Sequence, residues 1–160
     1  MLVFITGATS GIGKSTAEIF AKHGHDLIVT GRREERLIEL KRDLEGRYKI
    51  KVSFLHFDVR SLEEVEIAIN SLTPENKQID VLVNNAGLAA GLSSIQEGTI
   101  SHWERMIDTN IKGLLYITRA ISNIMIKNGK GHIINIGSIA GKEVYANGNV
   151  YCATKHAVDA

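Results

Sequence analysis

A tyrosine and a lysine near the end of the chain have the types and spacing needed for acid–base chemistry. Tyr151 and Lys155 lie four positions apart, so on a helix they share one face. A nearby ammonium group stabilises a phenolate and lowers the pKa of a tyrosine from its ordinary value of about 10. Such a phenol can transfer a proton near neutral pH, as general acid–base catalysis requires. Any helix contains such pairs by chance, so the pair needs support from other residues.

Other polar residues stand where they could support this pair. Ser138 follows an apolar segment, and its hydroxyl could hold a carbonyl oxygen, although serines at strand ends usually form turns. Asn110 interrupts a helical pattern in which asparagine has a low propensity, so it is either functional or an exposed, slightly destabilising residue. The segment Asn84-Asn85-Ala86-Gly87 ends another apolar run. The carboxyl ends of parallel strands meet at the edge of a sheet where ligands bind.

A glycine-rich turn, Thr6-Gly7-Ala8-Thr9-Ser10-Gly11-Ile12-Gly13, stands between the first apolar segment and the first helical one. Glycines there permit a tight turn and let the backbone approach a pyrophosphate at the helix N-terminus. An ordinary β–α turn is equally compatible with these residues, because the spacing departs from the commoner G-x-G-x-x-G. The end of the turn, Gly13-Lys14-Ser15, resembles a Walker A motif. That motif needs a glycine where Ala8 stands, and no later strand ends in an aspartate for magnesium.

The end of the second apolar segment, Thr30-Gly31-Arg32-Arg33, bears on the choice of dinucleotide. A site for NAD would place an acidic residue there to accept a hydrogen bond from the ribose 2′-hydroxyl. Two guanidinium groups instead suit the 2′-phosphate of NADP. The alternative is a solvated basic start to a helix over residues 33–44, where an arginine is unfavourable against the helix dipole. The sequence therefore favours NADP.

The segments that position these residues alternate between two kinds. Apolar runs predict buried parallel strands over residues 2–6, 27–30, 52–57, 79–83 and 133–137. Helical spacing separates them, and the pairs Ser61/Glu64 and Ser101/Glu104 have the spacing of capping boxes. The longest helix is predicted from Ser101 to about Lys127. One side of it carries Trp103, Ile107, Ile111, Leu114 and Ile121.

This alternation predicts a doubly wound α/β fold, a parallel sheet with helices on both faces in three layers, as in the Rossmann fold. Residues 1–160 are expected to form one domain that ends within the Tyr151 helix, and the fold is expected to be incomplete at its C-terminal end. The chain therefore reads as the N-terminal part of a longer protein.

The composition excludes several other classes of protein. A formal net charge of +1 gives no electrostatic argument for binding nucleic acid or an anionic membrane. Cys152 is the single cysteine, and of the six histidines only His23 and His25 are close, too near in sequence to face each other on a helix, so no metal site is expected. The start lacks the pattern of a signal peptide, and no apolar run reaches the ~18 residues of a membrane span. A cytoplasmic location is expected.

Taken together, these residues resemble the short-chain dehydrogenase/reductase family. The resemblance rests on the glycine-rich turn, Asp58-Val59, the segment that contains Asn84 and Asn85, Asn110, Ser138 and Tyr151-x-x-x-Lys155. Longer stretches are similar to the NADP-dependent 3-hydroxy acid dehydrogenases that act on serine and 3-hydroxypropionate. These stretches are Thr30-Gly31-Arg32-Arg33, residues 84–89, residues 106–110, residues 131–138 and residues 148–151.

The resemblance implies a role for each of these residues. Tyr151 would be the catalytic acid–base, Ser138 would hydrogen-bond the substrate oxygen, Lys155 would bind the nicotinamide ribose and lower the tyrosine pKa, and Asn110 would hold a water in a proton relay. Asp58 and Val59 would flank the adenine, and Asn85 would line the cofactor cleft. The remaining cofactor contacts would come from Gly7, Ser10, Gly11, Ile12, Gly13, Arg32 and Arg33.

The reaction implied by the resemblance is hydride transfer between NADP and the carbon that bears a 3-hydroxyl group. Family members continue beyond this length with two more strands and form dimers or tetramers through the long helix and the Tyr151 helix. The alternative is that this chain binds NADP and catalyses nothing. In either case the partners are small molecules and other copies of the same chain.

Overall fold

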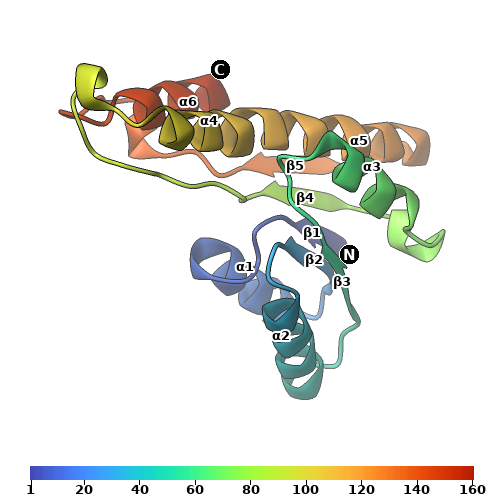
Figure 1. Cartoon of the computed structure of the whole chain (residues 1–160). Helices are drawn as coiled ribbons and strands as arrows, with labels where there is room; N and C mark the ends of the chain where they lie inside the picture. Colours follow the sequence, from blue (N-terminus) through green and yellow to red (C-terminus); the bar gives the residue numbers. More distant parts are fainter.

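The computed structural model describes all 160 residues as a parallel sheet covered by helices (Figure 1). The strands are β1 (Leu2–Ile5), β2 (Asp26–Gly31), β3 (Val52–His56), β4 (Val81–Asn84) and β5 (His132–Asn135). The helices are α1 (Gly11–Lys22), α2 (Glu34–Arg47), α3 (Leu62–Asn70), α4 (Ile100–Ile107), α5 (Leu114–Asn128) and α6 (Asn149–Asp159). No helix is long and apolar enough to cross a membrane.

The sheet has the strand order β3-β2-β1-β4-β5, and every neighbouring pair is parallel. The predicted doubly wound Rossmann fold is therefore confirmed. The strand order reverses direction between β1 and β4, and in open parallel sheets this switch point is where ligands bind, beyond the carboxyl ends of the strands.

Helices cover both faces of the sheet, because side chains of successive strand residues alternate between the faces. Val3 and Ile5 of β1 pack in one buried cluster with residues of α1 and α2, whereas Phe4 packs in the other with residues of α3 and α5. Figure 1 shows α1 and α2 on one side of the sheet and α3, α4, α5 and α6 on the other. The three predicted layers are present.

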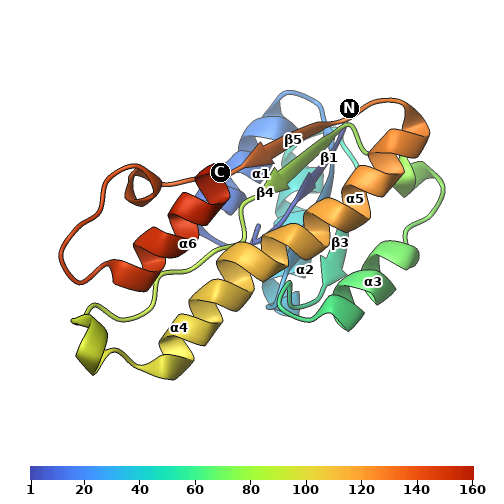
Figure 2. The ribbon, with the colours of Figure 1, turned by 90° about the horizontal axis from the view of Figure 1, so that it is seen from above.

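The long helix differs from the prediction, because it is not one uninterrupted α-helix. A π-helical segment, Asp108–Gly113, joins α4 to α5 (Figure 2). A π turn holds one residue more than an α turn, so it shifts the helix face that follows. The predicted apolar side is therefore partly wrong, and Ile107 is exposed. The buried positions are Met106, Thr109, Asn110, Gly113, Ile117, Ile121 and Met125.

Of the two predicted capping boxes, one forms in part and the other does not. The Ser61 hydroxyl accepts a hydrogen bond from the Glu64 backbone N–H at 3.2 Å and caps α3. The Glu64 carboxylate, however, accepts from the Asp58 backbone N–H instead of from Ser61. The second prediction is wrong, because α4 begins at Ile100 with Thr99 as its N-cap, and Ser101 already lies in the first turn.

Candidate active site

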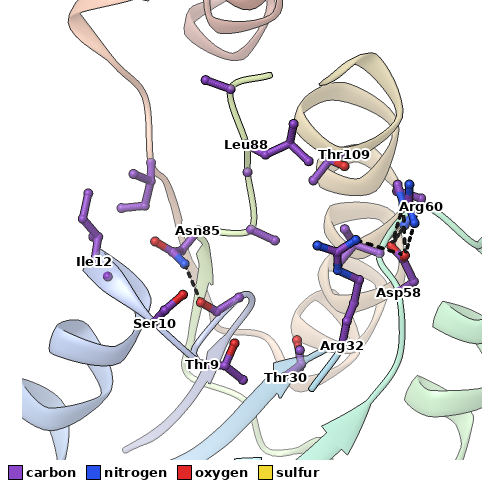
Figure 3. Close-up of a pocket in the computed structure, with 18 of the residues that line it drawn as sticks. Thr9, Ser10, Ile12, Thr30, Arg32, Asp58, Arg60, Asn85, Leu88 and Thr109 are labelled. Carbon is purple, nitrogen blue, oxygen red and sulfur yellow. Dashed lines mark hydrogen bonds and ion pairs between the residues drawn. The ribbon is translucent and has the colours of Figure 1, made fainter. Parts of the chain in front are cut away.

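A cleft of about 810 Å³ opens at the carboxyl ends of the strands, beside the glycine-rich turn (Figure 3). Most of the predicted site residues line it. They are Gly7, Ser10, Gly11, Ile12, Arg32, Arg33, Asp58, Val59, Asn85, Tyr151 and Lys155. Gly13, Asn110 and Ser138 are not among the lining residues. The cleft therefore joins the candidate acid–base pair to the predicted cofactor loop.

The glycine-rich turn is held in shape by the side chain of Asn85. Its Nδ2 donates to the carbonyl oxygens of Thr6 and Gly7 at 2.8 and 3.1 Å. Gly7 has a φ of +66°, a conformation that L side chains rarely adopt. A Cβ on Gly13 would collide with the Asn85 amide and with the Gly7 carbonyl. Gly13 thus lies behind the turn and allows Asn85 to fasten it.

The hydroxyl of Thr6, the first residue of the glycine-rich turn, makes a second link whose role the sequence did not predict. It accepts hydrogen bonds from the backbone N–H groups of Asn85 and Ala86, at 3.0 and 2.9 Å. Thr6 itself is buried at the end of β1. This side chain ties the turn after β1 to the segment after β4 across the switch point of the sheet.

The two arginines at the end of β2 lie on different sides of the cleft mouth. Arg33 Nη2 donates to Thr9 Oγ1 at 2.8 Å and to Ser10 Oγ at 3.1 Å, so it bridges to the glycine-rich turn. Arg32 extends toward Asp58, with 3.8 Å between Arg32 Nη1 and Asp58 Oδ2, and 55% of its side chain stays exposed. One guanidinium therefore lies beside the glycine-rich turn and the other beside Asp58.

The carboxylate of Asp58 is paired with Arg60, a residue that sequence reasoning missed. Arg60 Nε and Nη2 donate to Asp58 Oδ2 at 2.9 and 2.6 Å (Figure 3). Burial raises the pKa of the Asp58 carboxyl, but the hydrogen bonds from Arg60 outweigh burial and hold that pKa below its ordinary value. Asp58 is therefore an ionised acceptor at neutral pH.

Asn110 lies in the π-helical segment, and its buried amide is used within the protein. Oδ1 accepts from the Leu88 backbone N–H at 2.9 Å, while Nδ2 donates to the Leu88 carbonyl at 2.9 Å and to Thr154 Oγ1 at 3.0 Å. These bonds explain why an asparagine stands in mid-helix. They join the segment after β4 to helix α6, which carries the candidate acid–base pair.

Tyr151 and Lys155 both face the cleft from α6. Lys155 is buried, and its Nζ donates to the Ile136 carbonyl oxygen at 2.9 Å. Burial lowers the pKa of its ammonium below the ordinary value. Ser138 caps the short turn Ile139–Gly141, where its hydroxyl accepts from the Ala140 backbone N–H at 3.1 Å.

Two buried hydroxyls of the cleft have no partner within the protein. Thr30 Oγ1 at the end of β2 and Thr109 Oγ1 in the π-helical segment make no hydrogen bond, and both residues line the cleft. Buried polar atoms are normally satisfied. The arginines and the N-terminus of α1 make the cleft chemically suited to a phosphorylated dinucleotide.

A doubly wound sheet with a glycine-rich turn and a cleft at the carboxyl ends of its strands is typical of dinucleotide-binding proteins. The whole chain, residues 1–160, matches the family model of the short chain dehydrogenases, and the chain belongs to this family. It is 50% identical over 155 residues to the NADP-dependent 3-hydroxy acid dehydrogenase YdfG of Salmonella typhi, and 49% identical over 155 residues to the Escherichia coli (strain K12) protein of that name. Both alignments cover 97% of this chain and 61% of the relative, so the chain spans about three fifths of the length of these relatives.

Solved structures agree with this assignment. The crystal structure of serine dehydrogenase from Escherichia coli superposes with a TM-score of 0.91 at 48% identity, over 99% of this chain and 71% of that chain. The closed form of serine dehydrogenase complexed with NADP⁺ gives a TM-score of 0.91 at 49% identity, over 99% of this chain and 62% of that chain. The predicted family is confirmed, and so is the similarity to 3-hydroxy acid dehydrogenases.

Proposed function

We propose that this protein transfers a hydride between NADP and a small 3-hydroxy acid such as serine or 3-hydroxypropionate. The observation that carries the proposal is that Tyr151 and Lys155 line the same cleft as the glycine-rich turn and the two arginines. The similarity to 3-hydroxy acid and serine dehydrogenases at about half identity supports the substrate class.

Each end of the cleft suits one part of the cofactor. Arg32 and Arg33 would hold the 2′-phosphate, and the backbone of Gly7, Ser10, Gly11 and Ile12 would hold the pyrophosphate at the N-terminus of α1. Asp58 and Val59 would flank the adenine. The nicotinamide of the bound cofactor would supply the hydride acceptor for oxidation of the hydroxyl, and its reduced form the donor for reduction of the carbonyl.

The remaining chemistry is proton transfer by side chains of the chain itself. In the oxidation direction the substrate hydroxyl gives its proton to the Tyr151 phenolate as the hydride leaves the adjacent carbon. The Lys155 ammonium would stabilise that phenolate and bind the nicotinamide ribose. Ser138 can still donate its hydroxyl hydrogen to the substrate oxygen, because it uses only an acceptor lone pair in capping.

The Asn110 amide already makes hydrogen bonds within the protein, and these limit how it could hold the water of the proposed relay. Both sides of its amide are engaged by Leu88 and Thr154, so any relay water would share the second lone pair of Oδ1 or use the backbone. The relay stays a prediction.

The test is reduction of NADP with L-serine or 3-hydroxypropionate as donor. We expect turnover in the unmodified chain and a loss of at least about 10²-fold in Tyr151→Phe, the lower end of typical general acid–base contributions. Tyr116→Phe is the matched control, because Tyr116 lies on α5 outside the cleft. Equal turnover in the two variants would contradict the role of Tyr151.

A second candidate function is NADP binding without turnover. It is favoured by the position of Ser138, which is predicted to hold the substrate oxygen but does not line the cleft. Binding of NADPH in preference to NADH, with no turnover for any donor, would select this candidate over the enzyme. A dimeric or tetrameric assembly and a cytoplasmic location stay predictions; gel filtration of the chain tests the first.

A further inference from the structure

The adenine end of the cleft holds one carboxylate between two guanidinium groups. Arg60 binds Asp58 closely, with Nε donating to both carboxylate oxygens at 3.1 and 2.9 Å and Nη2 donating to Oδ2 at 2.6 Å. The Arg60 backbone N–H donates to Oδ1 as well, at 3.0 Å. Arg32 makes only a 3.8 Å ion-pair contact with Oδ2. The two arginines therefore share one acceptor very unequally.

The arrangement around Asp58 is rigid on the Arg60 side. The backbone N–H of Asp58 donates to the Glu64 carboxylate at 2.8 Å, which fixes the turn between β3 and α3. The Arg60 side chain is 34% exposed and that of Asp58 19%, whereas the Arg32 side chain is 55% exposed and makes only the longer ion-pair contact with Asp58. Arg32 is thus the guanidinium that remains available to a ligand.

Whether the Asp58 carboxylate is paired with an arginine affects how strongly an anionic ligand can bind nearby. A carboxylate paired bidentately with an arginine is close to neutral toward its surroundings. An unpaired carboxylate at the same place would capture Arg32 and would also repel a phosphate dianion, because charges a few ångströms apart interact strongly near a protein surface. The pairing of the Asp58 carboxylate therefore determines whether Arg32 is available to bind a phosphate.

We propose that Arg60 is a positioning residue for cofactor selectivity: by occupying Asp58, it keeps Arg32 free for the 2′-phosphate of the dinucleotide. This inference rests on the proposed use of NADP and names the device that supports it. Arg60 need not touch the phosphate. It acts through Asp58, which its own bonds hold toward the adenine side of the cleft.

The test compares two probes that differ only in the 2′-phosphate, 2′,5′-ADP and 5′-AMP, by calorimetric titration. The ratio of their affinities is the readout, because a loss of folded protein weakens both probes alike. We expect Arg60→Gln to reduce that ratio by about tenfold, the scale of one charged hydrogen bond. The double variant Asp58→Asn/Arg60→Gln should restore the ratio, because no carboxylate is left to capture Arg32.

The outcomes separate this inference from the proposed function. If the unmodified chain binds the two probes equally, the preference for NADP itself fails before any variant is considered. If the unmodified chain prefers 2′,5′-ADP but Arg60→Gln lowers both affinities equally, Arg60 only stabilises the turn and the inference is wrong. An unrestored ratio in the double variant would equally overturn the capture of Arg32.

Discussion

At the scale of single residues, the hydrogen bond between Asn110 and Thr154 connects the helix of the acid–base pair to the long helix. Thr154 is fully buried, and its hydroxyl donates to the Tyr151 carbonyl at 2.8 Å while it accepts from Asn110 Nδ2. Replacing the hydroxyl with a methyl group leaves a buried amide hydrogen without this partner. An unsatisfied buried donor costs about 1–3 kcal/mol.

Thr154→Val is therefore expected to lower the free energy of unfolding by about 1–3 kcal/mol, measured by urea denaturation. Thr154→Ser keeps the hydroxyl and serves as the control; we expect it to lose less stability. Equal losses in the two variants would assign the effect to packing and not to the hydrogen bond.

The buried ammonium of Lys155 makes a prediction about pH. Because burial lowers its pKa in the folded state, the unfolded chain holds this proton more tightly. Burial of the charged ammonium therefore destabilises the folded protein. This destabilisation is fully present below the folded-state pKa and disappears as the pH rises to the ordinary lysine pKa of about 10.4. The Lys155 contribution to stability therefore rises with pH across the alkaline range.

Lys155→Met should remove this rise. We expect the difference in unfolding free energy between Lys155→Met and the unmodified chain to shift in favour of the unmodified chain as the pH increases from 7 to 10. Titrating groups that do not interact with Lys155 cancel in that difference. A difference that stays constant over this range would show that the folded protein does not perturb Lys155.

Sequence reasoning identified the residues whose chemical type and spacing alone indicate a functional site. Tyr151 with Lys155, the turn glycines Gly7 and Gly11 and the arginines after β2 all line the cleft, whereas Gly13 does not. Arg60 and Thr154 were missed, and the role of Thr6 was not predicted, because a threonine or a surface arginine becomes informative only when its distant partner is known. The Thr6 hydroxyl, for example, serves N–H groups 79 and 80 residues away.

At the scale of elements, the strands were predictable and the long helix was only partly so. Strands buried on both faces are apolar at consecutive positions, so their cores were found with ends displaced by one or two residues. The π-helical segment depends on Asn110 reaching Leu88 and on Gly113 approaching Val59. Neither contact leaves a periodic pattern in the sequence.

Gly113 makes that approach possible and links helix packing to the cleft. A Cβ added there would lie 2.8 Å from Val59 Cγ2 and 3.2 Å from the Val59 carbonyl oxygen. Such crowding typically costs about 1–3 kcal/mol and moves the neighbour. Since Val59 lines the cleft, its displacement would reach the proposed adenine site.

Gly113→Ala should therefore reduce both stability, by about 1–3 kcal/mol, and the affinity for 5′-AMP. The control is Gly46→Ala on the exposed side of α2, where an added Cβ meets nothing within 4 Å. That change should stabilise the protein by up to about 1 kcal/mol, since alanine is the better helix former. Unaltered 5′-AMP binding in Gly113→Ala would show that the packing of this helix does not affect the cleft.

At the scale of the whole molecule, segments from every strand meet at one edge of the sheet. The turn after β1, Arg32 after β2, Asp58 after β3, Asn85 after β4 and Gly137 after β5 all line the cleft. Because the strands are parallel, their carboxyl ends fall together whatever the length of the helices between them. This is why a site made of residues far apart in sequence could be predicted from their position after apolar segments.

The same sheet carries an open edge at β5, which pairs with β4 alone. Ile133 on this strand is 37% exposed. An exposed apolar edge strand is a template for pairing with another chain, and a net charge of +1 provides little repulsion between copies.

We therefore expect the 160-residue chain to associate with itself through β5, with a sedimentation coefficient that increases with concentration. Ile133→Lys should abolish that increase, because a lysine on the edge opposes pairing. Ile67→Lys on α3 is the matched control, at a site 63% exposed and away from the edge, and should leave association unchanged. An equal effect of both variants would assign association to general surface hydrophobicity, and a constant sedimentation coefficient in the unmodified chain would contradict it altogether.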